Sequence, residues 1–145
     1  TDAAIDGFNS FAHVRPPLRS EADRAALREG LVSGVIDAIC SDHQPLDASA
    51  KLAPFPATEP GMSTLETVLP LGLQLVRDGV LTESRLIAAL TCRPADVLGL
   101  EKNTGWLLID PSAQWTVAAD TLLSTGKNTP WFGQVMQGKV VRVFD

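Results

Sequence analysis

A short apolar run in the first third of the chain limits what this sequence can fold into. Residues 35–40 are mostly apolar, and the polar segment 41–45, which contains Asp42, follows at once. A run of this length and composition fits a strand buried in a parallel sheet better than one that faces water. In parallel α/β folds, reactive side chains gather where the strands end. The run therefore predicts an α/β fold with a candidate site at Asp42.

A helix is predicted before this run and a long loop after it. Ser20 begins the helix, because Asp23 stands three residues later as in a capping box, and Gly34 ends it. The loop at 47–61 is rich in proline and closes with Gly61. A loop of this length in a compact domain is usually functional or mobile.

Helices continue after the loop and then give way to strands. A buried helix is expected at about 63–78, a second follows its N-cap at Thr82, and a third at 93–98 ends at Gly99. Short β-like runs follow at 106–109, 115–117, 121–123 and 140–144, separated by turn residues. We therefore expect an α/β domain at 1–100 and a β domain at 101–145.

Composition excludes several classes of function. The net charge is −5 and basic residues form no stripe, so we expect no nucleic-acid partner. No apolar stretch approaches the roughly 20 residues that cross a bilayer, and the first residues resemble no signal peptide, so we expect no membrane partner. Cys40 and Cys92 lie far apart in apolar contexts, so we expect them to be buried, reduced thiols of a cytoplasmic protein. The first residue is not Met, and we expect an internal piece of a longer protein.

Five segments together resemble the dihydroorotase family of the amidohydrolase superfamily. In chain order they read VRPPLR at 14–19, GVIDAICSDHQP at 34–45, PGMSTLETVLPL at 60–71, RPADVLGL at 93–100 and GKNTPWFG at 126–133. Each is weak alone, whereas five in the family's order make a chance match improbable. The resemblance covers nearly the whole chain and implies the last part of a metal-dependent (β/α)₈ TIM barrel, followed by strands of a small β-sandwich.

The resemblance also implies a chemistry. The family hydrolyses the cyclic amide of dihydroorotate in pyrimidine biosynthesis, typically with zinc held by histidines and a carboxylated lysine. Asp42 takes the position of the carboxylate that approaches the metal and moves a proton from the metal-bound water to the leaving nitrogen. Pro60 and Gly61 match the loop whose main chain touches substrate, although a helix-entry turn would also explain them. His43 and His13 are read as structural histidines.

Two departures from the family pattern concern substrate binding. Leu46 stands where the family has a histidine that binds the substrate carboxylate, and Arg15 replaces an asparagine that contacts substrate. Leucine offers no hydrogen bond, and arginine is longer and differently shaped than asparagine. The chain has only two histidines and no His-x-His pair, so zinc is expected to be absent or incomplete here, with any further ligands upstream. The segment before Gly105-Trp106 is also shorter than in the family.

These departures leave three hypotheses open. The favoured one is a noncatalytic dihydroorotase-like subunit that supports assembly of aspartate carbamoyltransferase, as degenerate bacterial homologues do. Its expected partners are the transcarbamoylase catalytic chain and the remainder of its own barrel, in an oligomer. The alternatives are an active zinc dihydroorotase with upstream ligands, and another cyclic amidohydrolase such as a hydantoinase or allantoinase.

Overall fold

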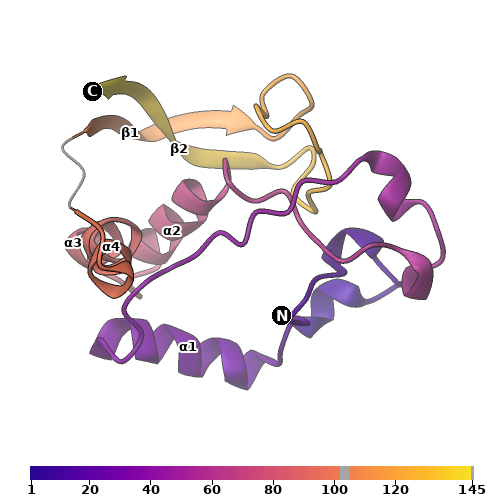
Figure 1. Cartoon of the computed structure of the whole chain (residues 1–145), viewed down its shortest axis with the longest axis horizontal. Helices are drawn as coiled ribbons and strands as arrows, with labels where there is room; N and C mark the ends of the chain where they lie inside the picture. The colour runs from indigo at the N-terminus through magenta and orange to yellow at the C-terminus, as the bar shows by residue number, and fades with distance from the viewer. Residues whose placement is uncertain (102–104, 145) are drawn as a thin grey trace. The chain divides into compact units, whose positions relative to one another are not determined.

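The computed structural model describes residues 1–101 and 105–144, which form a mixed α/β structure (Figure 1). Its helices and strands are α1 (Glu21–Ser33), α2 (Val68–Arg77), α3 (Glu83–Leu90), α4 (Cys92–Leu98), β1 (Trp106–Thr116) and β2 (Val135–Phe144), with short 3-10 helices at Asp2–Ile5, Ser10–Ala12, Ala48–Lys51 and Phe55–Ala57. The sequence before Gly105-Trp106 is shorter than the family pattern. This segment includes residues 102–104 and so lies partly outside the described residues.

The chain divides into two compact units, each made of three separate stretches. We call residues 1–26, 41–66 and 116–134 the loop unit, and residues 27–40, 67–115 and 135–145 the helical unit. All the site residues predicted from the sequence fall in the loop unit. The expected division near residue 100 is not tested by this arrangement and stays a prediction.

The helical unit is built from α2, α3, α4 and the strands β1 and β2. β1 and β2 form a two-stranded sheet, and α2 packs against β2 (Figure 1). Gly138 lets this helix and strand approach, since a Cβ there would lie 2.4 Å from Leu73 Cδ1. Gly72 likewise makes room for Leu86, which is 1% exposed. Apolar side chains therefore hold this unit together.

The buried strand predicted at 35–40 is wrong both in its secondary structure and in its burial. Residues 35–36 form a bend, residues 37–40 have no regular secondary structure, and the run belongs to no sheet among the described residues. Val35 is 82% exposed, and Cys40, which was expected to be buried, is exposed too. Ile39 N–H donates to the Ala89 carbonyl at 3.0 Å, and the Arg85 guanidinium donates to the Ile36 and Asp37 carbonyls. A strand needs a neighbouring strand that supplies a ladder of backbone hydrogen bonds. Here Ile36, Asp37 and Ile39 form their backbone hydrogen bonds with residues of helix α3 instead.

Local end signals predicted most helix boundaries. The Ser20 hydroxyl accepts a hydrogen bond from Asp23 N–H, and the Asp23 carboxylate accepts one from Ser20 N–H, which confirms the capping box. The Thr82 side chain accepts from Arg85 N–H, and Gly99 ends α4 in the left-handed conformation at φ 64°. The helix expected from Ser63 begins only at Val68, because residues 63–66 take part in contacts of the loop unit.

The β-rich end contains fewer and longer strands than its sequence predicts. The runs at 106–109 and 115–117 belong largely to the single strand β1, and 140–144 lies in β2. The run at 121–123 is a turn, in which the Thr121 hydroxyl donates to the Thr116 carbonyl and accepts from Ala118 N–H. No helix in the described part of the chain is long and apolar enough to cross a membrane.

Candidate functional site

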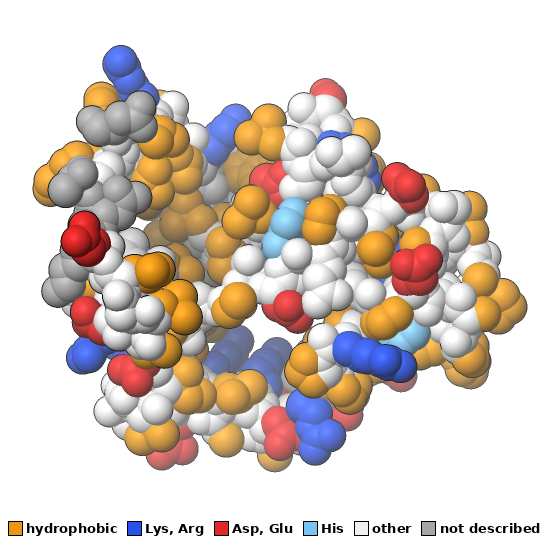
Figure 2. All heavy atoms as spheres, viewed as in Figure 1, with side chains coloured by type: hydrophobic (Ala, Val, Ile, Leu, Met, Phe, Trp, Pro, Cys, Tyr) orange, Lys and Arg blue, Asp and Glu red, His pale blue; other side chains and the backbone are white. Residues whose placement is uncertain are grey.

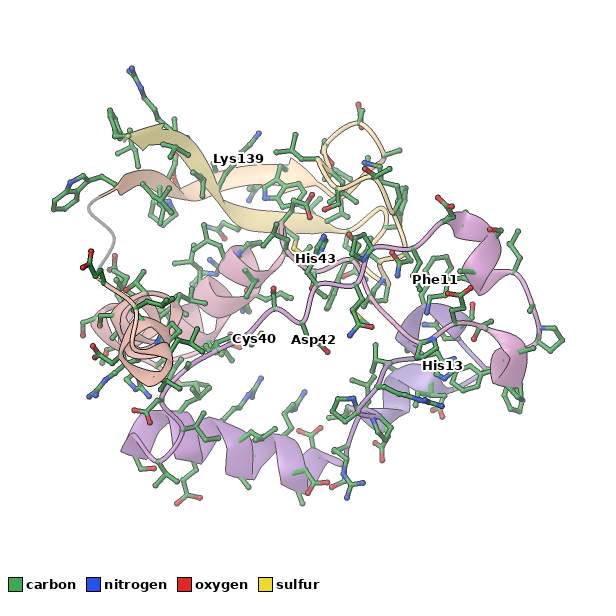
Figure 3. All side chains as sticks on the ribbon, viewed as in Figure 1. Phe11, His13, Cys40, Asp42, His43 and Lys139 are labelled. Atoms are coloured by element: carbon green, nitrogen blue, oxygen red, sulfur yellow. The ribbon has the colours of Figure 1, made fainter. Side chains whose placement is uncertain are left out.

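Asp42, which lies just after residues 35–40, has an unusual backbone conformation. Its φ is 44°, in the left-handed region that non-glycine residues adopt rarely and aspartate more readily than most. The side chain is exposed, and Gln44 Nε2 donates to its Oδ1 at 3.0 Å. Figure 3 shows Asp42 and His43 leaving the chain on opposite sides. Backbone strain of this kind is frequent at functional sites, and it presents the carboxylate on the side away from His43.

His43 is held by a hydrogen-bond network on the other side. Its Nδ1 accepts from the backbone N–H groups of Thr64 and Leu65, each at 3.0 Å. The ring proton therefore lies on Nε2, which is 3.2 Å from Ser124 Oγ and donates to it. With both nitrogens engaged, His43 in this arrangement acts neither as a base nor as a metal ligand, which favours the structural interpretation.

Ser124 connects this hydrogen-bond network to Glu66. Its hydroxyl and its backbone N–H donate to Glu66 Oε1 at 2.7 and 2.6 Å. Burial tends to raise the pKa of Glu66, but the hydrogen bonds from the Ser124 hydroxyl and backbone N–H hold the pKa below its ordinary value. Glu66 is thus a half-buried carboxylate that these hydrogen bonds keep charged. The sequence analysis did not single out Ser124 or Glu66, although Glu66 lies in one of the family-like segments.

Leu46 and Gly61, two of the predicted substrate-binding positions, lie against each other. Gly61 has φ 143°, and a Cβ there would be 3.2 Å from Leu46 Cδ1. The Gly61 N–H donates to the His13 carbonyl at 2.9 Å, which also brings the chain leading to Arg15 close. Arg15 itself is exposed, and Pro60 is half-buried beside Gly61. The structure therefore gathers these segments, with an apolar side chain at position 46.

The long loop at 47–61 is tied down by His13 and Lys51. The His13 ring stacks on Phe55 at 4.7 Å, and its Nδ1 lies 2.8 Å from Thr58 Oγ1. Lys51 is 3% exposed, and its Nζ donates to the carbonyls of His13 and Glu59. Burial lowers the pKa of Lys51, and Glu59 partly opposes this. His13 thus has a structural role, while Lys51 is a residue that sequence reasoning missed.

A pocket of about 310 Å³ adjoins Leu46. Its lining residues are Pro45, Leu46, Asp47, Ser49, Ala50, Glu59, Thr125 and Gly126. Two of these are acidic and none is basic, so the pocket suits neutral or cationic groups better than a carboxylate.

The residues present do not by themselves fit a zinc site. Within 1–101 and 105–144, no group of three or more His, Cys, Asp or Glu side chains is placed to hold a metal. Asp42 supplies one carboxylate, and both nitrogens of His43 are committed to hydrogen bonds. Structural and catalytic zinc sites need three or four protein ligands. We therefore derive no catalytic step through a metal, and the metal-binding role of Asp42 stays a prediction.

Comparison with other sequences gives consistent matches over nearly the whole chain. The sequence profile of the amidohydrolase family matches residues 9–144. The chain is 45% identical over 148 residues to a dihydroorotase of Pelobacter propionicus, covering 97% of this chain and 35% of that protein. It is 46% identical over 147 residues to a dihydroorotase-like protein of Pseudomonas aeruginosa, covering 97% and 34%. The chain thus spans about a third of the length of the curated relatives it matches.

Solved structures agree on the fold. An L-hydantoinase (dihydropyrimidinase) from Arthrobacter aurescens matches with a TM-score of 0.86 and 26% identity, over 99% of this chain and 35% of that one. An inactive dihydroorotase-like domain of a Chaetomium thermophilum CAD-like multifunctional protein matches with a TM-score of 0.65 and 25% identity, over 93% and 39%. These matches confirm the α/β fold class predicted from the sequence, the C-terminal part of an amidohydrolase barrel.

Proposed function

This chain belongs to the amidohydrolase family, and from that premise we propose that it is the C-terminal third of a dihydroorotase-like protein that does not turn over dihydroorotate. Both dihydroorotases and dihydroorotase-like proteins are about 45% identical to it, so overall identity does not separate the active from the inactive reading. The decision rests on the residues at the substrate positions.

Leu46 carries the proposal. Its side chain lies against Gly61, at the position where the resemblance expects a histidine that binds the substrate carboxylate. A hydrogen bond to a charged group typically contributes about 1.5–3 kcal/mol. Loss of that bond together with the changed contact at Arg15 corresponds to binding weakened by roughly 10²–10⁴-fold, at about 1.4 kcal/mol per tenfold.

The charge of the neighbouring pocket supports the same conclusion. Asp47 and Glu59 line it beside Leu46, and no basic side chain does. An anionic substrate would meet acidic groups there. Similarity to a solved domain that is called inactive and dihydroorotase-like adds further support.

We propose that the role of the whole protein is to support an assembly with the catalytic chain of aspartate carbamoyltransferase. The resemblance to degenerate bacterial homologues motivates this partner. The β1–β2 sheet also exposes large apolar side chains, including Trp106, Val141 and Val143, and apolar side chains gather there in Figure 2. Such surfaces are usually covered by another part of a protein or by a partner. Co-purification of the full-length protein with the transcarbamoylase chain tests this role.

One observation favours a second candidate, an active dihydroorotase with upstream metal ligands. Asp42 is exposed and presented by a left-handed backbone, as a reacting carboxylate would be. A third candidate, a hydantoinase-like enzyme, follows from the likeness to the Arthrobacter protein. These candidates predict turnover of dihydroorotate and of hydantoin, respectively.

The test is turnover by the full-length protein supplied with zinc. We expect no measurable hydrolysis of dihydroorotate, hydantoin or allantoin by the folded protein. The single variant Leu46→His and the double variant Arg15→Asn/Leu46→His should bind dihydroorotate at least about tenfold more tightly than the parent, because they restore hydrogen-bonding groups. Easily measured turnover by the unmodified protein would rule out the noncatalytic proposal.

A further inference from the structure

The segment 126–130 belongs to the family-like sequence pattern, yet none of its residues was expected in the site. These residues lie far along the chain from Asp42, but in the folded structure they contact residues 45–46, which follow Asp42. A Cβ on Gly126 would lie 2.3 Å from Leu46 N and 2.6 Å from the Pro45 carbonyl carbon. Real Cβ atoms essentially never approach backbone so closely, so only glycine permits this contact.

Asn128 stands two residues later and is 1% exposed. Its Oδ1 accepts from Leu46 N–H at 2.7 Å. Its Nδ2 donates to the Gln44 carbonyl at 3.0 Å and to the Gly61 carbonyl at 3.1 Å. The backbone of Asn128 forms a further hydrogen bond, in which its carbonyl accepts from Ser63 N–H at 3.1 Å.

These bonds use both amide protons and the acceptor of one side chain. An asparagine amide offers two donors and one carbonyl oxygen, and no other side chain of this length does. Aspartate would keep the acceptor for Leu46 but lose both donors. Alanine would leave one buried N–H and two carbonyls without their partner, which is costly for buried groups.

We propose that Asn128 is a positioning residue that fixes the backbone on both sides of the candidate substrate site, with Gly126 packed beneath it. It holds residues 44–46 and Gly61 at a set separation, and so decides where the side chain at position 46 points. This inference deepens the proposed function, because it rests on position 46 and Gly61 being the family's substrate positions. Asn128 acts through these backbone segments and touches no reacting atom.

The test is amide hydrogen exchange on the full-length protein with three variants. Asn128→Ala removes all three side-chain bonds, Asn128→Asp keeps the acceptor alone, and Asn9→Ala is the matched control at an exposed asparagine. In Asn128→Ala we expect the Leu46 amide to exchange roughly 5–30-fold faster, with helix α3 unchanged. Asn128→Asp should also speed exchange at Leu46, because its second carboxylate oxygen would face the Gln44 and Gly61 carbonyls without a proton to share. Asn9→Ala should leave the exchange at Leu46 unaltered.

Two results would overturn the proposal. One is unchanged exchange at Leu46 in Asn128→Ala. The other is equal acceleration at Leu46 and throughout α3 in Asn128→Ala, because Asn128 would then contribute only to general stability.

A second measurement separates this inference from the proposed function. We expect Leu46→His to gain affinity for dihydroorotate, and adding Asn128→Ala should cancel at least about tenfold of any such gain. No gain from Leu46→His would contradict the proposed function, while hydrogen exchange at Leu46 would still decide the role of Asn128. A gain that survives Asn128→Ala in full would contradict the positioning role alone.

Discussion

The loop unit and the helical unit are held together by different kinds of contact. The buried residues of the helical unit are mostly apolar: Leu73, Leu81, Leu86, Ala89 and Met136, with Thr67 as the polar exception. The loop unit buries more polar side chains than apolar ones, and its polar group is Lys51, Thr58, Ser63, Asn128 and Thr129. Apolar packing is non-directional, whereas hydrogen bonds demand particular atoms in particular places. The unit with the candidate site is therefore the one that depends on individual side chains.

The largest expected effect tests the apolar half of this comparison. Leu86→Ala removes a side chain that is 1% exposed and packs on Gly72, so it should lower the free energy of unfolding by about 2–5 kcal/mol. Urea unfolding of the full-length protein measures this. Ile87→Ala, on the exposed face of the same helix, is the control and should cost far less. Equal losses of unfolding free energy in Leu86→Ala and Ile87→Ala would show that buried apolar packing is not what stabilises the helical unit.

Gly126→Ala should come next and tests the close backbone contact in the loop unit. The added methyl meets the backbone of Pro45 and Leu46, which cannot rotate away, so overpacking should cost about 1–3 kcal/mol or more. Gly72→Ala is the matched control, because its Cβ would meet the tip of the Leu86 side chain instead. If Gly72→Ala were the more damaging change in thermal unfolding, the contrast between the units would be reversed.

The smallest effect, and the one that depends on pH, concerns Ser124. Its hydroxyl donates to a Glu66 carboxylate whose pKa is lowered in the folded protein. A lowered carboxyl pKa contributes stability above the unfolded value of 4.5, and this contribution is lost as the pH falls through the folded pKa. Ser124→Ala should therefore cost about 1.5 kcal/mol at neutral pH and progressively less in acid.

Unfolding midpoints measured from neutral to acid pH check this prediction. Ser33→Ala, an exposed serine that bonds only to helix carbonyls, should show a small and pH-independent difference. A Ser124→Ala penalty that stays constant as the pH falls would show that Glu66 does not supply it.

Sequence reasoning succeeded where the signal was local. The caps at Ser20, Thr82 and Gly99 depend on residues within a few positions, and the structure has all three. It failed where the outcome depended on a distant partner. The run at 35–40 has strand composition, but its backbone is bonded to α3, and composition alone does not say what lies beside a segment.

The site divides in the same way. The sequence by itself determined the family-like segments, the carboxylate at Asp42 and the apolar side chain at Leu46, because each is a matter of which side chain occupies which position. Only the tertiary structure decided that His43 is engaged by Ser124, which is 81 residues away, and that Asn128 reaches Leu46 across 82. Hydrogen bonds are set by distance and angle in space, and no periodicity in the chain records which distant residues will meet.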